Sequence, residues 1–215
     1  MTFFLYLCAQ KANNHMTRLY LMRHGETIDN ARQMMQGQVQ GELNAEGIRQ
    51  AEQVRDEWAD KHVDAFVASD LRRSFDTARI VAEPHHLDVN TTPLLRERDW
   101  GDFTGRYIPD LKDQPWPDNV EKLDHLLDRA RQFLHYIYNM YKGQTVLAVG
   151  HGIINKAIQA VYYNCQMKDV TRMTNAEVRL LELSPSWFPQ PEKAPSCLPQ
   201  PGEVAPHDDS ASNEG

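Results

Sequence analysis

The sequence predicts a three-layer α/β/α sandwich with a mostly parallel central sheet. Short apolar runs with β-branched residues alternate along the chain with longer stretches of helical periodicity. The short runs are apolar almost throughout, which is typical of parallel strands that are buried on both faces. Three of these runs end at clusters of polar residues, two of which contain glycine, and open α/β sheets carry their active sites beyond such strand ends.

The elements follow in order from these patterns. Strands are predicted at residues 19–22, 63–68, 145–149 and 178–183. Asn44 is a favourable N-cap for a first helix with apolar residues at Ile48, Ala51, Val54 and Trp58. A second helix carries Leu71, Phe75, Ala78, Ile80 and Val81, and a third carries Val120, Leu123, Leu127, Ala130, Leu134 and Ile137. A fourth is predicted at residues 153–163. We interpret all these apolar stripes as core.

The length of 215 residues, with 41% hydrophobic residues, predicts one domain with a sizeable core, placed at residues 16–183. Residues 1–15 are interpreted as an N-terminal extension outside the fold, because their apolar run is too short to span a bilayer and no basic residue precedes it. Residues 184–215 hold seven of the 12 prolines, which predicts an extended or disordered tail. Trp187 and Phe188 could hold the start of this tail against the domain.

Charge and cysteine content narrow the class of protein. The formal net charge of −7 argues against nucleic-acid binding, and nothing in the sequence predicts a membrane partner. Cys8, Cys165 and Cys197 are odd in number and lack the spacing of a disulfide framework, so we expect free thiols and a cytoplasmic location. The oligomeric state is left open, with a homodimer as one alternative.

Arg23, His24 and Gly25 directly follow the first predicted strand. A strand that ends there would present an imidazole and a guanidinium to a crevice at the edge of the sheet. Glycine permits a tight turn after the pair, and the planar cation of arginine matches the oxygens of a phosphate. The segment therefore predicts a reactive histidine beside an anion site.

Three further segments supply groups that a phosphoryl-transfer site needs. Arg73 falls in the first turn of the second helix, where a basic side chain is unfavourable unless an anion is bound. Glu97 lies in a charged, glycine-containing loop with Trp100, which could line a substrate pocket or fill the core. Gly150, His151 and Gly152 end the third predicted strand. These segments predict a common phosphate site.

Together these motifs resemble the histidine phosphatase superfamily, also called phosphoglycerate mutase-like proteins, over residues 17–183. The resemblance implies His24 as the phosphorylated nucleophile, Glu97 as proton donor, and phosphate binding by Arg23, Asn30, Arg73, His151 and Gly152. Gln36 would join the substrate pocket, with Thr27 and Trp100 as further candidates. The chain departs from the family pattern at residues 40–44 and at Thr104, which lie at the rim of the expected pocket.

The chemistry of these residue types agrees with that expectation. A neutral imidazole can take up the phosphoryl group, and arginines with a protonated His151 would stabilise charge on its oxygens. Glu97 would have to hold a proton for the leaving oxygen. The sequence contains no recognisable metal-binding motif, so we predict a metal-independent reaction without a cofactor.

Three functions are compatible with the motifs. The first is hydrolysis of a small phosphorylated metabolite through a phosphohistidine. The second is a cofactor-dependent phosphoglycerate mutase, and the third is a catalytically idle phosphate-binding or protein-interaction module. The connection from Glu97 to His151 spans 151 − 97 = 54 positions. The family implies a longer, covering insertion in mutases, so we favour a phosphatase; the compact chain resembles α-ribazole phosphatases and broad-specificity relatives.

Overall fold

The computed structural model describes residues 16–187. The predictions for the N-terminal extension and for the tail beyond Trp187, including Cys8, Phe188 and Cys197, lie outside the described residues. Within residues 16–187, no helix combines the length and apolar character that crossing a bilayer requires.

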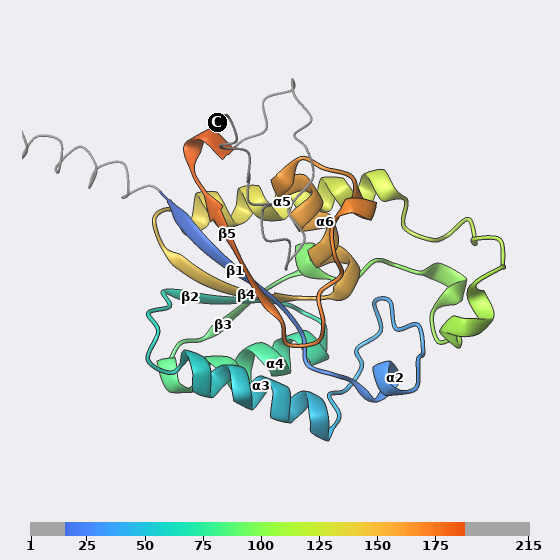
Figure 1. Ribbon diagram of the computed structural model, residues 1–215, viewed down its shortest axis with the longest axis horizontal. Helices are drawn as coiled ribbons and strands as arrows, with labels where there is room; N and C mark the ends of the chain where they lie inside the picture. Colours follow the sequence, from blue (N-terminus) through green and yellow to red (C-terminus); the bar gives the residue numbers. More distant parts are fainter. Residues whose placement is uncertain (1–15, 188–215) are drawn as a thin grey trace, which may run out of the picture.

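A five-stranded sheet forms the centre of the fold (Figure 1). Its strands are β1 (Thr17–Arg23), β2 (Ala65–Ser69), β3 (Val89–Thr92), β4 (Thr145–Gly150) and β5 (Val178–Leu183). Their order is β3-β2-β4-β1-β5; the first four are mutually parallel and β5 runs antiparallel to β1. This arrangement confirms the predicted mostly parallel sheet. The sequence prediction missed β3, an edge strand of four largely polar residues.

Helices pack on both faces of the sheet. They are α3 (Ala45–Trp58), α4 (Arg72–Ala82), α5 (Leu123–Met140) and α6 (Gly152–Tyr163). The short helix α2 (Ile28–Ala31) follows β1 and buries none of its residues. Short 3₁₀ helices are η1 (Glu83–His85), η2 (Pro93–Leu95), η3 (Gly101–Phe103), η4 (Ile108–Leu111), η5 (Met167–Asp169) and η6 (Pro185–Trp187). The four predicted helices are confirmed as α3, α4, α5 and α6, and Asn44 caps α3 by accepting from the Gly47 N–H at 2.8 Å.

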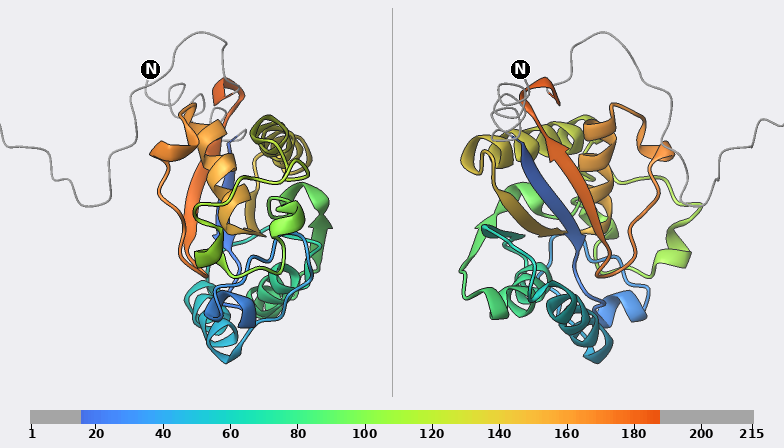
Figure 2. Two further views of the ribbon diagram at one scale, coloured as in Figure 1. Left: turned by 90° about the vertical axis from the view of Figure 1, so that its right-hand side faces the viewer. Right: turned by 60° about the vertical axis from the view of Figure 1, so that its left-hand side comes forward.

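The two faces of the sheet carry separate cores. Leu19 and Leu21 of β1 belong to a cluster beneath α5 and α6, whereas Met22 belongs to a cluster with Val54 and Trp58 of α3 and with residues of α4. Both views of Figure 2 show the two helix layers on opposite sides of the sheet. Because successive side chains of a strand point to opposite faces, each face buries alternate residues. The continuous apolar character of β1 has this origin.

Five predicted core residues differ from the structure, and two of them, Phe75 and Ile80 of α4, are only partly buried and lie outside the core clusters. Ile48 is 43% exposed, because the buried stripe of α3 starts at Gly47 and continues through Ala51, Val54 and Trp58. Leu123 is 45% exposed, because α5 buries Leu126 and Phe133 instead. Val120 is buried but precedes α5, in a small separate cluster with Phe103 and Leu111. Apolar spacing alone could not distinguish these neighbouring faces.

The start of the predicted tail packs onto α6. The Trp187 ring stacks on Tyr162 with 5.7 Å between centroids, and its indole N–H donates to the Tyr162 carbonyl at 3.0 Å. The described fold therefore continues three residues past Ser184, and the expectation that Trp187 would hold this segment against the domain is confirmed.

Candidate active site

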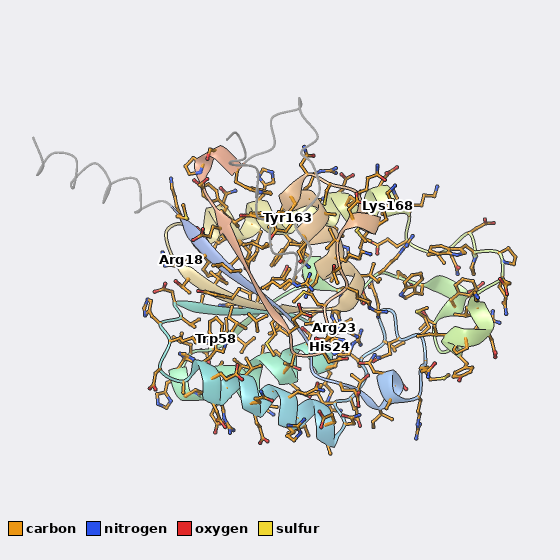
Figure 3. All side chains as sticks on the ribbon, viewed as in Figure 1. Arg18, Arg23, His24, Trp58, Tyr163 and Lys168 are labelled. Atoms are coloured by element: carbon orange, nitrogen blue, oxygen red, sulfur yellow. The ribbon has the colours of Figure 1, made fainter. Side chains whose placement is uncertain are left out.

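The predicted site residues meet where β1, β2 and β4 end. The register pairs Arg23 of β1 with Gly150 of β4, and the His24 N–H donates to the Gly150 carbonyl at 3.1 Å. The His24 and His151 rings consequently lie edge to face, with 5.0 Å between centroids. Figure 3 shows Arg23 and His24 together at the carboxyl end of β1. Arg73 reaches the same place from the first turn of α4.

His24 is held in one tautomer. Its Nδ1 lies 2.6 Å from the Gly25 carbonyl oxygen, which can only accept, so Nδ1 carries the proton. Nε2 is then the unprotonated nitrogen. Burial lowers the pKa of His24 well below its usual value, and the positive charges of Arg73 and Arg23 lower it further. The side chain is therefore neutral at pH 7, as attack on phosphorus requires.

Gly25 is needed for a different reason than the turn geometry that the sequence predicted. Its φ is not positive, but a Cβ at this position would collide with the Gly47 carbonyl at the start of α3. A Cβ on Gly47 would collide with Glu26 in return. The backbone after His24 thus lies directly against α3, and this close approach fixes the position of the imidazole.

Arg23 and Arg73 are buried, and each is only partly satisfied. The Arg23 guanidinium donates to the Met173 carbonyl at 2.8 Å, and that of Arg73 donates to Gly37 at 2.8 Å and to Gln40 at 3.0 Å. Burial lowers the pKa of both arginines to about 10, so both stay charged at pH 7. Within the described chain, the Nε of each side chain has no hydrogen-bond partner. Buried unpaired donors are costly, which indicates that a ligand satisfies them.

His151 is fully buried behind His24. Neither of its ring nitrogens has a hydrogen-bond partner among residues 16–187. Burial, followed by the charge of Arg73, lowers the pKa of His151 well below its usual value. The expectation of a protonated His151 is therefore wrong for the protein without a ligand, because two buried arginines already lie nearby. A bound dianion would oppose this electrostatic effect.

Glu97 lies at the N-terminus of α6. Its Oε1 accepts from the backbone N–H groups of Arg98 at 2.9 Å, Ile153 at 3.1 Å and Ile154 at 3.1 Å. Oε2 shares only the Ile153 N–H, at 3.1 Å. One oxygen thus anchors the side chain to the helix, while the other is left with free acceptor capacity beside the pocket.

Basic side chains hold the loop that carries Glu97. Arg96 forms an ion pair of 2.5 Å with Asp70 beyond the end of β2. Arg129 of α5 pairs with Glu121 at 2.8 Å and donates to the carbonyls of Leu94, Arg96 and Glu97. Arg98 donates to the Glu121 carbonyl. These contacts fix the position of the loop and therefore of Glu97.

A second loop places the polar residues at the other side of His24. Thr27 and Asn30 form a capping box at the start of α2, and Asn30 also accepts from Asn175 at 3.3 Å. Gln36 donates to the Thr27 hydroxyl at 2.8 Å, so its buried amide oxygen is left without a hydrogen bond. Thr27 therefore orients Gln36 and does not itself line the pocket.

These residues surround a pocket of about 210 Å³. Its lining consists of Arg23, His24, Asn30, Met34, Met35, Gln36, Gly37, Arg73, Glu97, Trp100, Ile108, Ile153 and Arg172. Trp100 lines the pocket and also packs against the cluster around Phe103, so both interpretations of this residue hold. His151 and Gly152 are buried behind the lining. Arg172 was not predicted, because it stands alone in a loop without a motif.

The five other histidines within residues 16–187 lie apart from the pocket. His62 contacts Asp64 at 2.9 Å on the surface, and the His85 ring packs against Phe66. His86, His125 and His135 are likewise absent from the pocket lining.

Comparison with known proteins now gives the family. Residues 19–188 match the model of the histidine phosphatase superfamily (branch 1). The chain therefore belongs to this superfamily, and the resemblance inferred from the motifs is confirmed.

Individual relatives carry names from both sides of the phosphatase and mutase alternative. The chain is 30% identical to the metal-independent phosphoserine phosphatase of Arabidopsis thaliana, over 80% of this chain and 79% of the relative. It is 35% identical to a probable phosphoglycerate mutase of Enterobacter, over 64% of this chain and 71% of the relative. The crystal structure of a putative α-ribazole-5′-phosphate phosphatase from Escherichia coli superimposes with a TM-score of 0.72 at 25% identity, covering 79% of this chain and 91% of that one.

Proposed function

We propose that this protein is a phosphomonoester hydrolase that acts on a small phosphorylated metabolite through a phosphohistidine at His24. The observation that supports this most strongly is the fixed tautomer of His24, whose Nδ1 proton is directed to the Gly25 carbonyl. Nε2 is left as a neutral nucleophile in a pocket that contains two buried arginines. An idle binding module would not require this arrangement.

In the proposed first step, Nε2 of His24 attacks phosphorus and the bond to the leaving oxygen breaks. Charge in such a transition state spreads over the three remaining oxygens. The unpartnered Nε atoms of Arg23 and Arg73, and the ring of His151, are the groups available to bind those oxygens. Because these donors are already held in place, little reorganisation opposes catalysis. Asn30 and Gln36 complete the proposed phosphate site from the α2 side.

Glu97 is proposed to donate the proton that the leaving oxygen needs. Oε2 is the oxygen for this task, because Oε1 already accepts from three backbone N–H groups. In the second step the same carboxylate would take a proton from the water that attacks the phosphohistidine. General acid catalysis of this kind contributes about 10²–10⁴-fold in rate.

Hydrolysis is favoured over mutase activity by the short segment between Glu97 and α5. This segment folds into η3, η4 and a cluster around Phe103 and Leu111, and it pairs with the loop before Gln36, where Met34 bridges Tyr107. Trp100 and Ile108 of this segment line the pocket, and Arg172, which also lines it, is exposed to solvent. A site that admits water permits hydrolysis of the phosphoenzyme.

The size of the pocket supports a small substrate. Its volume of about 210 Å³ is below the roughly 300–1,000 Å³ of pockets for drug-sized ligands. The polar lining is dominated by positive charge, which suits phosphate esters rather than neutral ligands. We also retain as proposals a domain that starts at residue 16, metal independence, a cytoplasmic location, the absence of nucleic-acid and membrane partners, and a homodimer as an alternative to the monomer.

Two assays with the full chain test this function. The first follows p-nitrophenyl phosphate and a panel of phosphorylated metabolites for release of inorganic phosphate. The second follows interconversion of 3- and 2-phosphoglycerate with and without 2,3-bisphosphoglycerate. Phosphate release with little interconversion supports the proposal. If interconversion exceeds phosphate release, the protein is a mutase. If neither activity is detected, the remaining alternative is a binding module.

A further inference from the structure

Arg172 is an exposed cation at the mouth of the pocket, and the proposed catalytic steps do not use it. It lies in the loop between η5 and β5, and its neighbour Met173 is buried and accepts a hydrogen bond from Arg23. The backbone at this point is therefore fixed. No hydrogen bond or ion pair joins the Arg172 guanidinium to any residue in the described chain. The nearby carboxylate of Glu177 is already bound by Arg179 at 2.6 Å and by Thr174.

Two guanidinium groups converge on the first residue of α6. A Cβ placed on Gly152 would lie 3.2 Å from Nε of Arg172 and 3.6 Å from Nε of Arg23. The latter atom is buried, has no partner within residues 16–187, and belongs to a side chain that is 8% exposed. Two like charges at the positive end of a helix repel each other unless an anion lies between them. In the protein without a ligand, the anion at this helix end is the Glu97 carboxylate, which accepts from the Ile153 and Ile154 N–H groups. Once Glu97 carries the proton for the leaving group, the place fits an anionic group of the substrate.

While Glu97 holds the proton for the leaving group, the positive charges of the pocket lining exceed what a phosphate alone can neutralise. The lining contains three arginines and one carboxylate, Glu97. A phosphomonoester supplies a charge of about −2 at neutral pH, and Glu97 adds none while it holds the proton for the leaving group. One positive charge is then left without a partner. Arg23 and Arg73 lie on the buried floor around His24, which leaves Arg172 on the rim as the unmatched cation.

We infer that Arg172 binds a carboxylate on the leaving group of the substrate and thereby selects carboxylated phosphomonoesters. The inference rests on the proposed function, since it describes what the same pocket accepts beside the phosphoryl group. A carboxylate has the charge that the pocket lacks, and its two oxygens fit the planar fork of a guanidinium. Because Arg172 and Arg23 both approach Gly152, the carboxylate would be bound close to the phosphoryl group.

Matched pairs of compounds test the inference. O-phosphoserine and O-phosphoethanolamine differ only in the carboxylate, and 3-phosphoglycerate differs from glycerol 3-phosphate in the same way. The wild-type chain should prefer the carboxylated member of each pair. In Arg172→Gln, the ratio of kcat/KM between the two members should fall about 10- to 100-fold, as expected for loss of a charged hydrogen-bonded pair. Most of the change should be in KM, and Arg172→Lys should restore part of the preference.

Lys168→Gln is the matched control. Lys168 is also exposed, and its replacement by glutamine removes the same positive charge. Lys168 lies on η5, well away from His24 (Figure 3). The control should keep the wild-type ratio. Even for compounds that are not hydrolysed, affinities can be compared. They follow from the inhibition constants with p-nitrophenyl phosphate as substrate and from calorimetric binding.

Three results would overturn the inference. An equal loss for both members in Arg172→Gln would place this side chain on the phosphoryl group. An unchanged ratio would exclude it from binding. In Arg172→Gln, kcat/KM could instead fall for fructose 1,6-bisphosphate relative to fructose 6-phosphate, with no change for the carboxylated pairs. This result would mean that Arg172 binds a second phosphate of the substrate and not a carboxylate. Failure of the wild-type chain to hydrolyse p-nitrophenyl phosphate would refute the proposed phosphatase function, while calorimetry would still decide the carboxylate preference.

Discussion

Replacing Arg129 by methionine should damage both stability and catalysis, although Arg129 does not line the pocket. This side chain on α5 binds the Glu121 carboxylate through three hydrogen bonds of 2.8 to 3.1 Å. It also donates to the carbonyls of Leu94, Arg96 and Glu97. Methionine fills a similar volume but has no donor, so Glu121 and the carbonyls of the loop lose their partner.

The magnitude follows from burial. The Arg129 and Glu121 side chains are only 16% and 13% exposed, so solvent screens this pair little. Removing one partner of a buried ion pair costs about 3–5 kcal/mol. Since Glu121 keeps the Asp99 N–H as a second donor, we expect the lower end, about 3 kcal/mol. For a domain of this size, that corresponds to a fall in Tm of roughly 6–12 °C.

The measurement compares Arg129→Met with Arg131→Met. Arg131 is on the same helix, and its ion pair with Asp128 joins side chains that are 50% and 62% exposed. Such a pair contributes at most about 1 kcal/mol, so this control should melt within about 3 °C of the wild type. Replacing Arg129 and Glu121 together by methionine should recover part of the loss, because no unpaired charge is left. Equal melting temperatures for Arg129→Met and Arg131→Met would refute the reasoning.

Three further predictions concern the chemistry of the site. Glu97→Gln keeps an oxygen for the three backbone N–H groups, so it should slow kcat for alkyl phosphates about 10²–10⁴-fold but affect p-nitrophenyl phosphate far less; an equal loss on both esters would assign Glu97 a structural role. The pKa values of His24 and His151 are lowered in the folded state, so below about pH 6.5 the unfolded chain takes up more protons and Tm should fall. In phosphate-free buffer the decrease of Tm with falling pH should be less steep in His151→Gln, because this variant has lost one of the two buried imidazoles. The same slope as in the wild type would contradict a neutral, buried His151 imidazole. EDTA should leave turnover unchanged while vanadate inhibits it, and activity lost on chelation and restored by a divalent metal would refute metal independence.

The sequence predicted the parts of the fold that are set by burial on both sides of the sheet. The runs at β1, β2 and β4 are continuous and apolar because both of their faces are covered, so their positions were evident. β3 was missed because two of its four residues are exposed, and backbone pairing with β2 determines it more than side-chain burial does. The start of α5 was placed too early because Val120 is buried by a loop cluster rather than by a helix face.

The site was predicted to the extent that its residues directly follow strands or begin helices. Arg23, His24, Arg73 and His151 are of this kind, since parallel strands bring their carboxyl ends to one edge of the sheet. Arg172 reaches the pocket because β5 folds back antiparallel beside β1 and brings the preceding loop to the same edge. That connection leaves no periodicity in the sequence, so the contribution of Arg172 could be found only in three dimensions.

The most direct test of the central claim is to identify the phosphorylated residue during turnover. The wild-type chain is mixed with p-nitrophenyl phosphate, quenched under alkaline conditions that preserve phosphohistidine, and mapped by mass spectrometry. We predict a phosphate on Nε2 of His24, with neither phosphoenzyme nor turnover in His24→Ala. Turnover in the wild-type chain with phosphate on another residue, or sustained turnover by His24→Ala, would contradict the assignment of His24 as the nucleophile.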